Sequence, residues 1–195
     1  KPYVFKGDGG TLENITLDSG RTDRTLRASG GFNLPGDLLL TPGMTLSTDA
    51  DWHFAGGDYP STSTAITQNL AVQGGVGTAT VQLAGGTLYI DDNFNGSRLY
   101  LDSGVTVKGH GRVIQYSGNG SLAPDSLFNF GTIEASDAGQ TLSIEGASLL
   151  NGGILKTSGG TLDVLSDIGF NSRWTAAAGS QIVVDGGTLK LGGSF

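Results

Sequence analysis

Among the 195 residues, the side chains best suited to chemistry are two adjacent carboxylates, Asp91 and Asp92, and the histidine of Gly109-His110-Gly111. Paired carboxylates cleave glycosidic bonds when one acts as a general acid and the other activates a water molecule. The competing interpretation is structural: Asp91, Asp92 and Asn93 form a turn after a strand over residues 87–90, and His110 lies in a glycine corner. We favour the structural interpretation because the sequence contains no convergent catalytic set.

Metal binding is the second chemistry that these residue types allow. Calcium requires several oxygen ligands at close spacing, and Asp91, Asp92 and Asn93 are the best candidate group. Two other acidic fragments, Gly7-Asp8-Gly9-Gly10 and Asp49-Ala50-Asp51, do not recur in register along the chain. A zinc site is disfavoured because the sequence has two histidines and no cysteine. Calcium is therefore the only cofactor that the sequence leaves open.

Aromatic and hydroxyl side chains suggest two further binding hypotheses. Trp52, Phe54 and Tyr59 lie within eight residues of one another. If exposed they form a contact patch for a sugar or a protein, and if buried they fill a wide part of the core; we expect at least one to be buried. Ice binding requires Thr-x-Thr on one flat face in successive repeats. Only a few threonines begin to resemble that pattern, namely Thr45, Thr62, Thr64, Thr78 and Thr80.

The composition excludes several classes of protein. Glycine accounts for 34 residues and charged side chains for 15%, whereas average proteins have about 7% glycine and 25% charged residues. Good helix formers are scarce, so an all-α protein is excluded. A formal charge of −7 argues against a nucleic-acid partner, and no apolar run approaches the roughly 20 residues of a membrane-spanning helix. The lack of cysteine excludes thiol chemistry and points weakly to a secreted protein.

A repeated unit runs through the chain. The tetrapeptide Gly-Gly-Thr-Leu occurs at residues 9–12, 85–88, 159–162 and 186–189. In the C-terminal half, the segment 127–135 aligns with the segment 149–157, which lies 22 residues later. A looser alignment places the segment 97–99 with the segment 172–174, and Val105 with Ile182. These matches indicate a unit of about 20–27 residues that is laid end to end.

Each unit contains short segments in which apolar and polar residues alternate, which is typical of half-buried strands. The clearest of these predicted strands cover residues 132–135, 141–145, 153–157, 161–164, 181–184 and 188–191. They could form an antiparallel sandwich or a solenoid in which each strand stacks on its equivalent in the next unit. We favour the solenoid because a sandwich has no reason to repeat the same glycine corner. The prediction is an all-β parallel β-helix that forms one domain over residues 1–195, with an irregular long loop over about 51–77.

The segment Asn129 to Val164, NFGTIEASDAGQTLSIEGASLLNGGILKTSGGTLDV, resembles the right-handed parallel β-helix of bacterial autotransporter passengers and filamentous-haemagglutinin-type exoproteins. In that family, asparagine–glycine corners alternate with GTIxA and GGTLxV strands, and the resemblance extends over roughly residues 80–195. The resemblance implies surface display or secretion and a rod-like stalk within a longer polypeptide, and its motifs specify an architecture rather than an activity. Asp91-Asp92 and Gly109-His110-Gly111 are also similar to motifs of polygalacturonase-type hydrolases, but the companion Asn-Thr-Asp and Arg-Ile-Lys signatures are absent.

We therefore expect a non-catalytic structural or adhesive module of a secreted or surface-displayed bacterial protein, such as an adhesin or a component of an extracellular matrix or filament. The expected partner is a protein or glycan ligand, or a second copy that stacks on the ends of the solenoid. Nucleic acid and insertion into a membrane are not expected. No residue is assigned a catalytic, cofactor-binding or metal-binding role. The alternative is a carbohydrate-binding or polysaccharide-cleaving β-helix protein that uses the Asp-Asp and Gly-His-Gly motifs.

Overall fold

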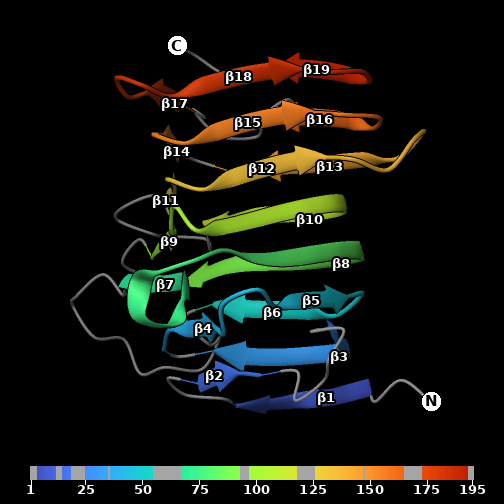
Figure 1. Cartoon of the computed structure of the whole chain (residues 1–195), viewed down its shortest axis with the longest axis vertical. Coiled ribbons are helices and arrows are strands. Elements are labelled where there is room, and N and C mark those ends of the chain that lie inside the picture. Colours follow the sequence, from blue (N-terminus) through green and yellow to red (C-terminus); the bar gives the residue numbers. More distant parts are fainter. Residues whose placement is uncertain are drawn as a thin grey trace.

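A computed structural model describes residues 4–11, 15–18, 25–34, 36–54, 67–92, 97–117, 126–146, 148–164 and 173–192. Within these ranges the chain is all-β, with one short 3-10 helix and no α-helix. No helix of the described residues has the length and apolar character needed to cross a bilayer. Successive turns of the chain, here called coils, stack along the long axis of the molecule, from the N-terminal strand at one end to the C-terminal strands at the other (Figure 1).

The strands and the single 3-10 helix of the described ranges follow one another without a long helical connection. In chain order they are β1 (Val4–Thr11), β2 (Ile15–Leu17), β3 (Thr25–Leu34), β4 (Leu38–Leu40), β5 (Thr45–Thr48), β6 (Asp51–Phe54), β7 (Thr67–Val72), η1 (Gln73–Gly75), β8 (Ala79–Asp92), β9 (Arg98–Leu101), β10 (Val105–Ser117), β11 (Ser126–Asn129), β12 (Thr132–Ala135), β13 (Thr141–Glu145), β14 (Ser148–Asn151), β15 (Ile154–Thr157), β16 (Thr161–Val164), β17 (Arg173–Ala176), β18 (Gln181–Val184) and β19 (Thr188–Leu191).

The strands form two parallel sheets, one of 12 strands and one of 7. The smaller sheet has the order β17-β14-β11-β9-β7-β4-β2. The larger sheet bends along its length: β5, β12, β15 and β18 lie on one side of the bend, β6, β13, β16 and β19 lie on the other, and β1, β3, β8 and β10 run through it. Every described pair is parallel and joins equivalent strands of neighbouring coils, which is compatible with the predicted solenoid and not with an antiparallel sandwich.

The strands of the C-terminal half have the bounds that alternation predicts. Strands β12, β13, β16, β18 and β19 coincide with the predicted segments, and β15 begins one residue later, at Ile154. In β12, Ile133 and Ala135 are buried, whereas Thr132 and Glu134 are partly exposed. Alternate side chains therefore face the interior, as expected for a strand with one buried face.

The register confirms one of the two repeat alignments and corrects part of the other. Asn129 pairs with Asn151, which confirms the 22-residue spacing. The first part of the looser alignment is confirmed, because Arg98 and Arg173 share one register position of the smaller sheet. Its second part is wrong by two residues, because Val107, rather than Val105, lies in the interior column that ends at Ile182. A shift of two residues keeps every side chain on the same face of a strand, so alternation alone does not detect it.

Large aromatic side chains are buried in the interior of the N-terminal coils. The rings of Phe32 and Trp52 stack with their centroids 4.4 Å apart, and Phe54 is fully buried beside them. The sequence predicts an irregular long loop over about 51–77, but this segment contains two regular strands, β6 and β7. The rings of Phe32 and Trp52 occupy paired positions on β3 and β6 of neighbouring coils. Residues 55–66 lie outside the described part of the chain.

Glycine is required where β10 turns the bend of the larger sheet. Gly109 and Gly111 have φ angles of 110° and 136°, which L-residues rarely adopt. A Cβ atom on Gly109 would also overlap the carbonyl oxygen of Leu83 in the preceding coil, and one on Gly111 would overlap that of Gly86. These two positions hold His110 between them, which confirms that this histidine lies in a glycine corner.

Candidate functional site

The structure does not bring the candidate catalytic residues to one place. Strand β8 continues through Asp91 and Asp92, so the expected turn at these residues is not formed; both pair with the end of β10 instead. The register places Asp91 beside Tyr116, whereas His110 lies beside Ala84. Residues 112–116 of β10 lie between these two positions and extend over about 13 Å. Glycosidase carboxyls that cooperate lie within about 10 Å of each other.

His110 has a partner that sequence analysis did not find. Its Nδ1 lies 2.6 Å from Oδ2 of Asp137, in the corner of the next coil, and both side chains are about one-third exposed. Oγ of Ser136 donates a hydrogen bond to Oδ1 of Asp137 at 3.0 Å. When His110 is neutral, its Nδ1–H donates a hydrogen bond to the carboxylate. Nε2, on the side of Gly85, is then a hydrogen-bond acceptor. The separation of 27 residues between the partners carries no local signal, and only the stacking of the coils reveals the pair.

A metal site is not visible in the described residues. No group of three or more histidine, aspartate or glutamate side chains lies close enough to hold a metal ion within these ranges. Asn93, which completes the calcium candidate with Asp91 and Asp92, lies outside the described residues. Of the other acidic fragments, Asp49 is exposed and Asp51 is half-buried at the start of β6.

Two glutamates on the outer face of the larger sheet form ion pairs between coils. Glu134 contacts Lys156 at 3.1 Å, and Glu145 pairs with Arg112. Burial opposes ionisation of Glu134, but hydrogen bonds from Ser158 and Lys156 and nearby lysine charges together hold its pKa below 4.5. The hydrogen bond from Arg112 dominates at Glu145; it outweighs the opposing effect of burial and, with a hydrogen bond from Ser143, also lowers the pKa. Both carboxylates are therefore charged near neutral pH and are committed to neighbouring side chains.

Threonines form a longer outward ladder than the sequence suggested. One outward register position is threonine in five successive coils, which contribute Thr25, Thr45, Thr80, Thr106 and Thr132. The outward position two residues further along the same strands carries Arg27, Ser47, Gln82, Lys108 and Glu134. The ladder therefore lacks the second threonine of a Thr-x-Thr array. Sequence analysis missed most of its members because their separation along the chain varies.

The aromatic residues divide between the interior and the surface. Trp52 and Phe54 are fully buried, which confirms the expected burial, while Tyr59 lies outside the described residues. On the outer face of the smaller sheet, the rings of Tyr100 and Phe128 stack at 4.5 Å with an interplanar angle of 7°, and Tyr100 lies 6.2 Å from the more exposed ring of Phe130. Rings stacked face to face present their edges to solvent, so this cluster offers little flat surface to a sugar.

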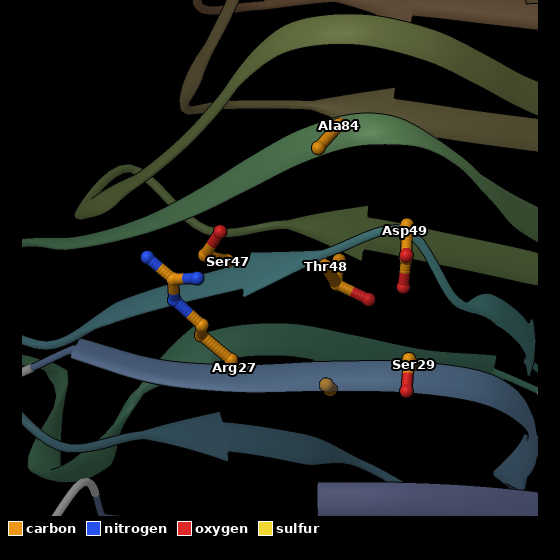
Figure 2. A pocket seen from close by; sticks show the side chains of 7 residues that line it. Arg27, Ser29, Ser47, Thr48, Asp49 and Ala84 are labelled. Atoms are coloured by element: carbon orange, nitrogen blue, oxygen red, sulfur yellow. The ribbon is translucent and has the colours of Figure 1, made fainter. Parts of the chain in front are cut away.

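A hollow of about 310 Å³ opens on the outer face of β3, β5 and β8 (Figure 2). It is lined by Arg27, Ala28, Ser29, Ser47, Thr48, Asp49 and Ala84. Figure 2 shows the Arg27 side chain extending from β3 toward Ser47 on β5, with Asp49 at the other end of the hollow, above Ser29. Small outward side chains on three neighbouring strands create this space, whereas the next coil carries longer ones, Lys108 and His110, at the adjoining positions.

Thr48 is not available to a ligand in this hollow. Its Oγ1 accepts hydrogen bonds from the backbone N–H of Ala50 at 2.9 Å and from Nε1 of Trp52 at 3.0 Å, and the side chain is buried. The outward polar groups are therefore the guanidinium of Arg27, the hydroxyls of Ser29 and Ser47, and the carboxylate of Asp49.

Comparisons of the chain with protein-family models, with curated proteins and with solved structures found no match.

Proposed function

We propose that this chain is a non-catalytic structural and adhesive module, built as a right-handed parallel β-helix, of a secreted or surface-displayed bacterial protein. The observation that carries the proposal is the continuous parallel pairing from β1 to β18, in which each coil covers the strand edge of its neighbour. With parallel strands about 4.8 Å apart, the eight strands of this path extend over about 34 Å. A stack of this kind holds outward side chains at fixed intervals, which suits a spacer that presents a binding surface.

The outer face supports adhesion more than catalysis. Its described groups form rows along the stack, such as the threonine ladder and the alternation of Lys108, Glu134 and Lys156. Polysaccharide cleavage, the alternative function, gains no support from the register, because Asp91 and His110 lie at different positions along β8 and β10. A surface that is repetitive and open is better suited to contact an extended partner than to enclose a reacting bond.

The test is to incubate the fluorescently labelled chain with immobilised polysaccharides and matrix proteins, and to measure both bound protein and newly formed reducing ends. The proposal expects retention on at least one surface and no increase in reducing ends over buffer. Reducing ends that increase with protein concentration and disappear in His110→Ala would overturn the non-catalytic assignment. Retention on none of the surfaces would overturn the adhesive part.

End-to-end assembly belongs to the same proposal. In the last coil, the interior-facing register positions include Ile182 and Val184, whose side chains are 43% and 60% exposed. Within the described residues, β17, β18 and β19 each pair on one side only, so a second copy could add strands there. Light scattering coupled to size exclusion should show larger species as concentration rises, and Val184→Lys should reduce them. A strictly monomeric species at high concentration would contradict the assembly.

A further inference from the structure

The hollow on β3, β5 and β8 has an uneven distribution of charge that indicates what it binds. Arg27 is exposed and has no ion-pair or hydrogen-bond partner among the described residues, whereas Lys156, Arg112 and Lys190 each contact a carboxylate. An exposed guanidinium with unused donors is the side chain best suited to hold a carboxylate through two parallel hydrogen bonds.

The opposite end of the hollow requires a different group on the ligand. Asp49 is exposed and can only accept hydrogen bonds when ionised, so it repels an anion and attracts hydroxyl groups. Ser29 and Ser47 lie between the two charges and can both donate and accept. A ligand that satisfies these groups has one carboxylate at its Arg27 end and hydroxyls at its Asp49 end.

The separation of the two ends excludes the smallest ligands. Arg27 and Ser29 are two residues apart on β3, which corresponds to about 7 Å along the strand, and Asp49 lies above Ser29 (Figure 2). An α-amino acid such as glycine carries its ammonium and carboxylate groups on the same carbon atom, too close together to reach both ends. An inorganic anion has no group for Asp49. One pyranose ring with a carboxylate spans the distance and presents hydroxyls along its edge.

We propose that this hollow binds a carboxylate-bearing sugar unit of an extended glycan, with Arg27 holding the carboxylate and with Ser29, Ser47 and Asp49 holding ring hydroxyls. The inference rests on the proposed adhesive function and names the class of ligand. The hollow is at the small end of ligand sites, which range from about 300 to 1,000 Å³, and it is open to solvent. A single site therefore binds weakly, with a dissociation constant on the order of millimolar, and adhesion depends on many copies acting together.

The experiment compares three probes that share one backbone: a β-1,4-linked glucuronate trimer, its methyl ester and cellotriose, each titrated into the full chain by NMR or calorimetry. We expect the trimer to bind at least about tenfold more tightly than the ester or cellotriose, because only the trimer can form charge-assisted hydrogen bonds to Arg27. Its affinity should fall as salt is added. Equal affinity for the three probes, or no binding of the trimer, would overturn the proposal.

Two variants and one control assign the binding to the hollow. Arg27→Gln should reduce the affinity for the trimer about tenfold while changing that for cellotriose less than twofold. Ala84→Gln, at an exposed position on the wall, should block the hollow and abolish trimer binding. Arg98→Gln, on the other sheet, is the control and should have no effect. An equal loss in the control, or glycine binding that depends on Arg27, would contradict the assignment.

This result is separable from the test of the proposed function. If the trimer does not bind but the chain still adheres to an immobilised surface, the inference about the hollow fails and the adhesive function stands. If the chain adheres to nothing and the trimer binds through Arg27, the hollow is a ligand site and the adhesive function fails. Circular dichroism of each variant checks that the strands remain formed.

Discussion

In the N-terminal coils large rings are packed into the interior among aliphatic side chains, whereas the described interior of the C-terminal coils holds aliphatic side chains and a pair of amides and no fully buried ring. One interior column shows the change along the stack; its register positions are Phe32, Trp52, Leu88, Val113, Ile144 and Val164. The coils up to β10 contain the long strands that run through the bend. The C-terminal coils use strands of four or five residues and repeat at a nearly constant length, which makes the repeat recognisable in the sequence.

Buried polar side chains occur in both halves, with Thr48 and Gln68 among those of the N-terminal half, and the C-terminal half contains a pair of stacked amides. Asn129 and Asn151 are fully buried and stack in register, with Nδ2 of Asn129 donating to Oδ1 of Asn151 at 2.7 Å. Nδ2 of Asn151 reaches the carbonyl of Gly153 at 3.4 Å. In the preceding coil the same column is occupied by Leu101. The comparison teaches that one interior column of this fold accepts apolar side chains and paired amides, even where the two meet in neighbouring coils.

Removing the largest ring should have the largest effect on stability. Trp52→Ala deletes a fully buried indole, its stacking with Phe32 and its hydrogen bond to Thr48. We expect the free energy of unfolding, measured by urea denaturation, to fall by about 3–5 kcal/mol. In the C-terminal half, Ile144→Val in the same column should lower the free energy of unfolding by about 0.5–1.5 kcal/mol. Equal losses for the two variants would mean that the two halves do not differ in how they are packed.

The second effect concerns the bend of the larger sheet, at the point where β10 passes through it. Gly109→Ala combines an unfavourable positive φ with overlap of the new Cβ and the Leu83 carbonyl, so we expect a loss of about 2–4 kcal/mol. Gly139→Ala is the matched control: its φ is 74°, but a Cβ there would meet no atom within 4 Å. The control should cost only the backbone strain, about 1–2 kcal/mol. If both variants unfold at the same urea concentration, close approach of the coils does not explain the glycine.

The third effect tests the buried amides. Asn151→Leu removes the acceptor of the Asn129 amide and leaves a buried donor with a weaker partner, so we expect a loss of about 1–3 kcal/mol. Replacing both asparagines by leucine should recover most of that loss, because leucine already occupies this column at Leu101. A double-mutant cycle by denaturation measures the recovery. A double variant that is less stable than the single one would show that the amides are required for more than their mutual bond.

The parts of the fold that were predictable are those in which adjacent residues carry the information. The alternation in Thr132–Ala135 or Thr161–Val164 specifies a strand and its buried face without any knowledge of neighbours. The 22-residue repeat that pairs Asn129 with Asn151 is also visible in the sequence, because the segment between these two residues contains no insertion. The glycine corner at His110 was predicted for the same reason, since tight corners require residues that tolerate positive φ.

The remaining features depend on register between coils, which the sequence does not display. The turn expected at Asp91 is a strand because the end of β10 lies alongside it, and the pairing of His110 with Asp137 depends on stacking across 27 residues. The hollow beside Arg27 results from three small outward residues on different strands. No spacing along the chain marks such a group, so the candidate site could be found only after the coils were aligned.

The smallest effect is a loss of stability in acid, which we expect to be confined to the coils that contain β10 to β15. The pKa values of Glu134 and Glu145 are both lowered from 4.5, so their ionised forms stabilise the fold at neutral pH. This contribution is complete above pH 4.5 and is lost as the pH falls through the lower values of the folded state. Because the partners are partly exposed, the loss should be only about 0.5–1 kcal/mol per pair. Glu145→Gln should lower stability at pH 7 and flatten the dependence of stability on pH below pH 4.5 in denaturation curves. Hydrogen exchange that rises first in the N-terminal coils on acidification would contradict this localisation.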